Sequence, residues 1–394
     1  MSDTTNDIWN DNDGEEEAPR KGGRMRRFWI FFLILAAVLG VVVVAAYRDG
    51  TGFDALRRLF AYGGAEAAGE VRYQYNESEN NRFAVLGNSL VVLSDTELRV
   101  LGEDGEEVWS TPVKMSAPAL ATGGGCAVAY DVGGTELYVV DERGEKLTLT
   151  ADAEEPFLSA RLNSEGYLAV TAGLNNFKGG VHVYNDQMEE IFLYRASERF
   201  VLDAYVTDDC SSLAAVTMGQ ENSVFVSNVI LYHLDEKEPA ADYDVTDGLV
   251  AAIGQQDGQL ITVSDTCLTS ADPDGEITAT YSYGGAYLRE YDLGGDGFTA
   301  LLLNRYRAGS VGRLVTVDAS GEEIASLDVS QEILGISAAG DYLAVLYMDS
   351  VVVYTRELEV YARMDNTDYA QGVLARADGS ALLLTAGEAR LFLP

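Results

Sequence analysis

The side chains in this sequence that could perform chemistry are few and scattered. Its two histidines, His182 and His233, lie in the alternating runs VHVY and ILYHL. A histidine pair could act as a general base or as metal ligands. However, no HxH, HExxH or G-x-S-x-G pattern accompanies them. Histidines within strands commonly pack against neighbours or face solvent, so we expect no catalytic residue and no metal site.

Acidic turns are the second candidate chemistry, because clustered carboxylates can bind calcium. The segments 272–276 (DPDGE) and 292–297 (DLGGDG) are the richest of them. An EF-hand loop needs acids at alternate positions, then Gly, then Glu six residues later, and neither segment fits. We interpret both segments as ordinary Asp-Gly turns between strands.

The three cysteines, Cys126, Cys210 and Cys267, are widely spaced and each lies in or beside a strand-like run. This arrangement is neither a disulfide framework nor a metal knuckle. We expect buried thiols, with one oxidised pair as the alternative.

One aromatic and basic cluster has the composition of a binding hot spot. Its members are Tyr281, Tyr283, Tyr287, Arg289 and Tyr291. They form our candidate partner-binding patch, and the alternative is that these rings pack between structural units.

A long uncharged run defines the N-terminal organisation. Residues 28–47 (FWIFFLILAAVLGVVVVAAY) would span ~30 Å as a helix, the thickness of a bilayer's hydrocarbon core. The preceding basic cluster RKGGRMRR predicts a cytoplasmic N-terminus. A cleaved signal ending near Val44 and Ala46 is the alternative, but its apolar part would be ~7–15 residues, shorter than this run.

We therefore predict four segments. Residues 1–27 are a disordered acidic cytoplasmic tail with a basic juxtamembrane cluster, and residues 28–47 are a single transmembrane helix. Residues 48–69 are a connector that could contain a short helix, and residues 70–394 are an extracytoplasmic domain. Residues 28–394 carry 22 basic and 56 acidic side chains. This negative field disfavours binding of nucleic acid or of anionic lipid surfaces.

The domain is repetitive. Short apolar runs begin at residues 90, 127, 168, 213, 260, 300, 343 and 382, spaced by 37 to 47 residues. Most are preceded by a turn signal and followed by an alternating strand such as 96–101, 135–140 or 229–234. Four short strands per unit at this period are typical of a β-propeller.

We predict an all-β fold, a propeller of eight four-stranded blades preceded by the transmembrane helix. Seven blades with one unit merged, or two β-sandwiches, are the alternatives. The last unit ends after its third strand, and residues 70–75 (EVRYQY) could supply the missing fourth strand and close the ring.

The segment TELRVLGEDGEEVW (residues 96–109) resembles the repeats of quinoprotein-like, PQQ-type propellers. Together with its N-terminal anchor, the chain resembles uncharacterised bacterial families of membrane-anchored propellers that contain domains of unknown function. Quinone-dependent dehydrogenases of this fold need a tryptophan platform, but Trp109 is the sole tryptophan after the span. We therefore expect no cofactor. The resemblance implies architecture and location but no activity.

The sequence thus favours a non-enzymatic platform at the cell membrane that binds or scaffolds an envelope protein. A cell-wall or carbohydrate-binding protein, or an envelope enzyme that uses acids of the central channel, is the alternative, so a glycan partner stays open. A sensor that signals through the tail is a third hypothesis. Converging carboxylates in the channel would favour an enzyme, whereas an exposed apolar patch would favour a protein partner.

Overall fold

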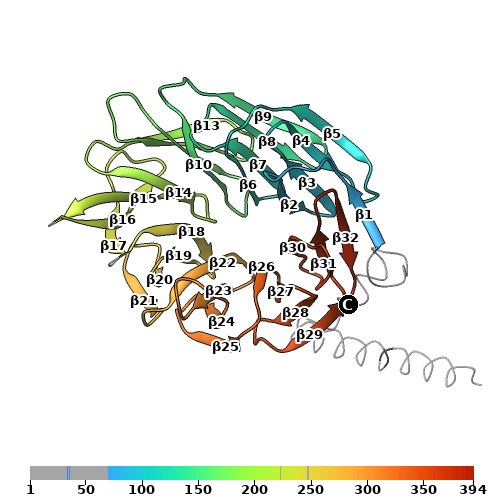
Figure 1. Cartoon of the computed structure of the whole chain (residues 1–394). Helices are drawn as coiled ribbons and strands as arrows, with labels where there is room; N and C mark the ends of the chain where they lie inside the picture. Colours follow the sequence, from blue (N-terminus) through green and yellow to red (C-terminus); the bar gives the residue numbers. More distant parts are fainter. Residues whose placement is uncertain (1–32, 34, 36–69, 222, 246–247) are drawn as a thin grey trace, which may run out of the picture. The chain divides into compact units, whose positions relative to one another are not determined.

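The computed structural model describes residues 33, 35, 70–221, 223–245 and 248–394. The described part of residues 70–394 contains strands, turns and loops, in eight sheets of four strands each, and it belongs to the compact unit Arg57–Pro394. The sheets are the blades of a ring (Figure 1). The prediction of an all-β, eight-bladed propeller is confirmed, and the seven-bladed and two-sandwich alternatives are wrong.

The first four blades are built from consecutive strands, in order from the innermost strand outward. Blade 1 contains β2 (Arg82–Leu86), β3 (Ser89–Leu93), β4 (Glu97–Leu101) and β5 (Glu107–Pro112). Blade 2 contains β6 (Pro118–Gly123), β7 (Cys126–Asp131), β8 (Glu136–Asp141) and β9 (Gly144–Thr150). Blade 3 contains β10 (Phe157–Leu162), β11 (Leu168–Ala172), β12 (Gly180–Tyr184) and β13 (Glu190–Arg195). Blade 4 contains β14 (Phe200–Val206), β15 (Ser212–Glu221), β16 (Val224–His233) and β17 (Ala241–Val245).

The other four blades follow the same order, except at the end. Blade 5 contains β18 (Val250–Gln256), β19 (Gln259–Ser264), β20 (Cys267–Ala271) and β21 (Ile277–Ser282). Blade 6 contains β22 (Tyr287–Gly295), β23 (Phe298–Asn304), β24 (Gly312–Asp318) and β25 (Glu323–Val329). Blade 7 contains β26 (Ile333–Ala339), β27 (Tyr342–Tyr347), β28 (Ser350–Thr355) and β29 (Val360–Asp365). Blade 8 contains β30 (Gly372–Ala375), β31 (Ala381–Leu384), β32 (Glu388–Phe392) and β1 (Glu70–Gln74).

The apolar runs that revealed the repeat are the second strands of the blades. All residues of β3, β7, β11, β23, β27 and β31 are buried. Neighbouring blades cover both faces of these strands, so both sets of alternating side chains are mainly apolar. Outermost strands such as β5 and β21 are largely exposed. The gradient from apolar inner strands to polar outer strands follows from the stacking of blades.

The hydrophobic core is a series of eight clusters, one between each pair of neighbouring blades. Burial of each Val, Leu or Ile side chain in them contributes ~1.5–3 kcal/mol. The cluster between blades 8 and 1 joins Tyr73 and Tyr75 to Leu90 and Leu382. The core therefore continues around the whole ring.

The N-terminal strand closes the ring, as the sequence predicted. Strand β1 pairs antiparallel with β32, with Tyr73 opposite Ala389 and Gln74 opposite Glu388. It is the outermost strand of blade 8, whose other three strands come from the C-terminal end. Closure removes an exposed sheet edge and ties both ends of the propeller together.

The blade connections define two faces of the ring. We call the side with the loops between second and third strands, and the linkers between blades, the loop face. The opposite side, with the turns between first and second and between third and fourth strands, is the turn face. Strand β1 starts at the turn face, because Glu70 lies opposite Leu391 and Tyr75 bonds to Gly387 in the loop-face turn of blade 8.

The predicted tail, transmembrane helix and connector lie outside the described residues, except for Leu33 and Leu35, which are helical. Among the residues that are described, none belongs to a helix with the length and apolar character needed to cross a membrane.

Candidate functional site

The innermost strands carry only three carboxylates, Asp203, Glu290 and Asp292. The two oxygens of Asp292 accept hydrogen bonds from the backbone N–H groups of Gly294, at 2.7 Å, and Ala338, at 3.0 Å. Glu290 accepts from Ile336 N–H at 3.2 Å. Burial raises the pKa of both carboxyl groups. The hydrogen bonds to Ile336 and Ala338 join blade 6 to blade 7, so both carboxylates have a structural role.

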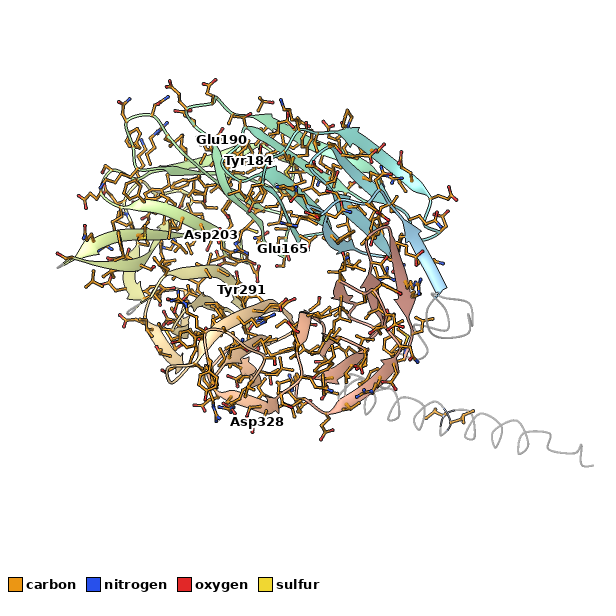
Figure 2. The ribbon with its side chains drawn as sticks, viewed as in Figure 1. Glu165, Tyr184, Glu190, Asp203, Tyr291 and Asp328 are labelled. Atoms are coloured by element: carbon orange, nitrogen blue, oxygen red, sulfur yellow. The ribbon has the colours of Figure 1, made fainter. Side chains whose placement is uncertain are left out.

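Asp203 is the centre of a polar cluster beside the channel. Its oxygens accept hydrogen bonds from Ser159 Oγ at 2.5 Å and from Arg161 Nε at 2.6 Å. Burial raises the pKa of Tyr291, and the positive charge of Arg161 partly offsets that effect. Figure 2 shows Asp203 and Tyr291 on the inner side of the ring. Because these groups satisfy one another, the eight inner strands present no unpaired, converging carboxylates.

The remaining channel wall near blades 1, 2, 6, 7 and 8 is mainly apolar. A cavity of about 480 Å³ lies there, lined mostly by small residues such as Ala84, Ala121, Ala338 and Ala375, with Asp292 among them. This surface offers space but few groups that could hold or activate a substrate.

The other chemical candidates have ordinary structural surroundings. His182 Nδ1 lies 2.9 Å from Glu190 Oε1, and His233 Nδ1 lies 3.0 Å from Ser212 Oγ. All three cysteines are free. No group of three or more His, Cys, Asp or Glu side chains suited to a metal ion occurs among the described residues.

The two acidic segments differ. Asp272 accepts hydrogen bonds from the N–H groups of Asp274 and Glu276, which makes an ordinary turn between β20 and β21, as predicted. The interpretation of residues 292–297 as one turn is wrong in part, because Asp292 lies within strand β22 and only the segment after Gly295 turns. A β-bulge between Asp292 and Gly295 lengthens the inner strand there.

The five residues of the predicted binding patch fall into two groups. Tyr281 and Tyr283 lie at the end of β21, with ring centroids 6.4 Å apart. Tyr287, Arg289 and Tyr291 lie on the innermost strand β22. Tyr287 and Arg289 are exposed, whereas Tyr283 is buried and Tyr291 donates a hydrogen bond to Ala251 O at 3.2 Å. The chain reverses between the groups, which therefore face different surroundings.

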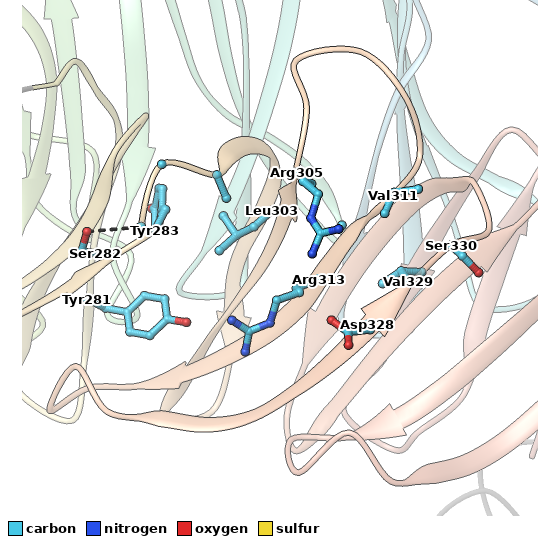
Figure 3. A pocket seen from close by; sticks show the side chains of 14 residues that line it. Tyr281, Ser282, Tyr283, Leu303, Arg305, Val311, Arg313, Asp328, Val329 and Ser330 are labelled. Carbon is cyan, nitrogen blue, oxygen red and sulfur yellow. Dashed lines mark hydrogen bonds between the residues drawn. The ribbon is translucent and has the colours of Figure 1, made fainter.

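Tyr281 and Tyr283 line a pocket between blades 5 and 6 that opens on the loop face (Figure 3). Its volume is about 640 Å³, and blade 6 contributes Arg305, Arg313 and Asp328. Tyr281 Oη donates to Glu323 Oε2 at 2.6 Å, and Arg313 Nη2 donates to Glu323 Oε1 at 3.1 Å. Burial, and then the hydrogen bond to Glu323, raise the pKa of Tyr281 to about 12.

Exposed large hydrophobic side chains are concentrated on the loop face of the ring. The set on its loops, linkers and adjoining strand ends comprises Val132, Phe177, Phe200, Val224, Phe225, Leu249, Tyr287, Tyr306, Val311, Leu334, Met348 and Tyr369. The other described ones in the propeller are the first or second residues of outermost strands, namely Val108, Ile191, Ile277 and Val360. These four lie at the turn-face ends of those strands, and the turns of that face, such as residues 102–106 and 272–276, are acidic.

The most prominent loop-face feature is an extension of blade 4, which protrudes in Figure 1. Pairing of β15 with β14 ends at Met218, opposite Phe200, and pairing of β16 with β17 begins at Ser227. Among the described residues, 219–221 and 224–226 therefore pair only with each other. We call these two segments the blade 4 arm.

The blade 4 arm is apolar as well as exposed. Val224 and Phe225 are 56% and 59% exposed, and Phe200 at its base is 53% exposed. Phe225 lies opposite Gln220, two residues from Met218, so Phe200, Met218 and Phe225 lie on the same side of the sheet. The strand predicted from the sequence began at residue 229, so the arm was missed. The run VFV before it was the available signal.

A closed ring of eight four-stranded blades defines a β-propeller protein. A family model matches residues 62–361, and the chain belongs to that family, DUF5711, a family of unknown function. No curated protein matches the chain.

Solved structures similar to this chain share its fold at low sequence identity. The C-terminal WD40 domain of Sif2 has a TM-score of 0.59 and 15% identity, covering 84% of this chain and 100% of that one. BamB from Moraxella catarrhalis has a TM-score of 0.52 and 11% identity, and the match covers 83% of this chain and 100% of that one. The dihydro-heme d1 dehydrogenase NirN, in complex with DHE, has a TM-score of 0.51 and 13% identity, and the match covers 75% of this chain and 67% of that one. These likenesses establish the propeller fold alone.

Proposed function

We propose that this protein is a membrane-anchored propeller of the cell envelope whose loop face binds a protein partner. The observation that carries the proposal is the concentration of exposed hydrophobic side chains on that face, with the blade 4 arm protruding from it. On the arm, Val224 and Phe225 are adjacent and Phe225 lies on the same side of the sheet as Phe200, and clustered exposed apolar surface of this kind is typical of protein interaction sites. Propellers support many functions, so this surface supports the proposal and the fold alone does not.

The sequence supports the envelope location. Residues 28–47 are the predicted membrane anchor, and the basic cluster before them predicts a cytoplasmic N-terminus. The predicted topology, with a cytoplasmic tail, puts the propeller outside the cytoplasm.

The arm offers two kinds of contact to a partner. Val224 and Phe225 supply apolar area, and the outer backbone edges of residues 219–221 and 224–226 supply N–H and C=O groups that no described neighbouring strand uses. Proteins commonly recognise such edges by adding a strand. We therefore expect the partner to present an apolar surface, with an extended segment at its edge.

A crosslinking comparison in native membranes tests the proposal. The full-length protein and two variants, Phe225→Ser and Val360→Ser, are crosslinked and their partners are identified by mass spectrometry. Val360 is the matched control, because it is 64% exposed but lies on the outermost strand β29. Both variants should fold normally, since exposed substitutions usually change stability by less than ~0.5 kcal/mol.

We expect one identified envelope protein to co-purify with the wild type and with Val360→Ser, and at least fivefold less of it with Phe225→Ser. Equal recovery with both variants would contradict the role of the arm. Absence of a protein partner, with the propeller retained on cell-wall material, would replace this proposal with the glycan-binding alternative.

A further inference from the structure

The loop face of blade 6 carries a group of exposed basic, aromatic and apolar side chains. We call this group the blade 6 patch, and its members are Tyr287, Arg289, Arg305, Tyr306, Arg307 and Val311. Tyr287 lies opposite Asn304, which is followed directly by the loop that carries the members from Arg305 to Val311. The start of β22 and this loop therefore lie side by side at one end of the blade.

Arg289 joins the patch through a β-bulge. The pairing of β22 with β23 shifts register between Leu288 and Glu290, so Arg289 is the extra residue of β22. A bulge changes the direction of a side chain relative to a regular strand. Arg289 lines a small pocket together with Ser310 of the neighbouring loop, so its side chain lies beside that loop.

The charge of the patch is opposite in sign to that of the propeller as a whole. Residues 305–313 contain three arginines and no acidic residue, in a chain with a net charge of −36. At the other end of the same blade, the turns and adjoining strand ends carry Asp296, Asp318 and Glu322 and no basic side chain. A local patch attracts groups of opposite charge within a Debye length of ~8 Å. Negative charge on a partner is therefore favoured at the loop face of blade 6.

Three guanidinium groups of the patch are available to a partner. Arg289, Arg305 and Arg307 are exposed, and their side chains make no hydrogen bond or salt bridge with another described residue. Guanidinium groups bind carboxylates in two-pronged geometry. Two carboxylates, Asp328 and Glu332, border the patch in the pockets on either side of the loop. Because three free cations outnumber these two carboxylates, the patch keeps a positive charge.

Exposed aromatic and apolar side chains accompany the arginines. Tyr287 and Tyr306 are 47% and 61% exposed, and Val311 is 45% exposed. Tyrosine and arginine are enriched at the energetically important positions of protein interfaces. The pocket between blades 5 and 6 adjoins the patch through Arg305 and Val311, and its volume of about 640 Å³ leaves space for an apolar side chain of a partner (Figure 3). The patch thus fits a partner that combines negative charge with apolar groups.

We infer that the blade 6 patch binds an acidic segment of a protein, whose carboxylates contact the three arginines and whose apolar side chains pack against Tyr287 and Tyr306. A short segment meets the patch alone. A broad anionic surface, such as a membrane or a cell-wall polymer, would also meet the exposed Asp349 and Asp368 on the loop face of blade 7 and its linker to blade 8. The inference rests on the proposed function, because it assigns a chemistry to the partner of the loop face, but it uses no residue of the arm.

Fluorescence anisotropy of a labelled peptide tests the inference, with the full-length protein in detergent micelles. The probe is a short acidic peptide that contains Phe and Leu (EEDFEEDL), and the comparison peptide is its amide counterpart (QQNFQQNL). We expect the acidic peptide to bind with a dissociation constant of about 0.1 mM at about 50 mM salt, and the amide peptide to bind at least about tenfold more weakly. Tripolyphosphate, an anion without apolar groups, should displace the acidic peptide only at about tenfold higher concentration.

Variants identify the site. Arg305→Glu and Arg307→Glu should each weaken binding of the acidic peptide at least about tenfold, because each replaces an attraction with a repulsion. Arg143→Glu is the matched control, since Arg143 is exposed on the turn face of blade 2 and its replacement changes the net charge by the same amount. Tyr306→Ala should weaken binding severalfold, whereas Tyr369→Ala, which removes another exposed tyrosine of the loop face, should leave binding unchanged.

Phe225→Ser leaves the patch intact and should bind the acidic peptide as the wild type does, so failure of this inference and failure of the arm's role are separate results. No peptide binding up to about 1 mM would overturn the inference. Equal binding of the amide peptide, displacement by an equal concentration of tripolyphosphate, or equal effects of Arg307→Glu and Arg143→Glu would also overturn it. Circular dichroism of each variant confirms that the fold is retained.

Discussion

Tyr73 offers a sharp test of how the ring is closed. The residue is 1% exposed between blades 8 and 1. Its hydroxyl donates to Asn88 O at 2.8 Å and accepts from Arg376 Nη2 at 3.0 Å. Tyr73→Phe removes these two hydrogen bonds and should lower the free energy of unfolding by about 1–3 kcal/mol. Tyr73→Ala also leaves a cavity in the core, so the loss should reach about 3–5 kcal/mol.

The assay is urea unfolding of the full-length protein in micelles, followed by circular dichroism. A loss of this size is large beside the 5–15 kcal/mol typical of folded domains. Tyr369→Ala is the control, because Tyr369 is almost fully exposed and its replacement should change the free energy of unfolding by less than ~0.5 kcal/mol. If Tyr73→Ala destabilises the protein no more than the control does, residues 70–74 do not close the ring.

Three further predictions concern stability, and the same urea assay measures each. Gly124→Ala should lower the free energy of unfolding by at least ~2 kcal/mol more than Gly125→Ala does. Both glycines have positive φ, but a Cβ on Gly124 would collide with the backbone of Gly166, whereas the space beside Gly125 is open. Equal losses would refute the contact. Asp203→Asn should lower the free energy of unfolding by about 3 kcal/mol, because it leaves Arg161 without its charge partner. Glu357→Gln, in an exposed ion pair, should lower it by less than ~1 kcal/mol. A comparable loss from the two variants would contradict the structural role of Asp203. Burial raises the pKa of Asp292 above the unfolded carboxyl value of about 4. The contribution of this carboxyl group to stability is therefore present below the unfolded pKa and is lost as pH rises through the folded pKa. Asp292→Asn should remove this decline in the free energy of unfolding, and an unchanged pH profile would refute the prediction.

The sequence predicted the architecture because the stacking of blades requires an apolar run in every repeat, and these runs recur at a regular spacing. Each second strand is covered on both faces, so every blade contributes an uninterrupted apolar run. The closing strand was predictable because the last repeat lacked an outer strand and residues 70–75 alternated without a partner of their own. Local pattern and global fold agree at these positions.

The candidate site was less predictable because its residues are brought together by blade packing. Tyr281 and Tyr283 were identified, but Arg305, Arg313 and Asp328 come from the next blade, 22 or more residues along the chain. Nothing in their spacing indicates a shared pocket. Tyr287, Arg289 and Tyr291 follow Tyr283 closely in sequence, but the turn at Gly284 and Gly285 carries them to the inner strand. The blade 4 arm was missed because it is defined by where the pairing of β15 with β14 and of β16 with β17 ends, which the local composition of VFV does not show.

Site-specific photo-crosslinking tests the central claim, partner binding at the loop face, most directly. A photoreactive residue replaces Phe225 on the blade 4 arm or Glu103 on the turn face of the full-length protein in native membranes. We predict an adduct with one identified envelope protein from position 225 and none from position 103. The same adduct from position 103 alone, or no protein adduct from position 225, would contradict the account.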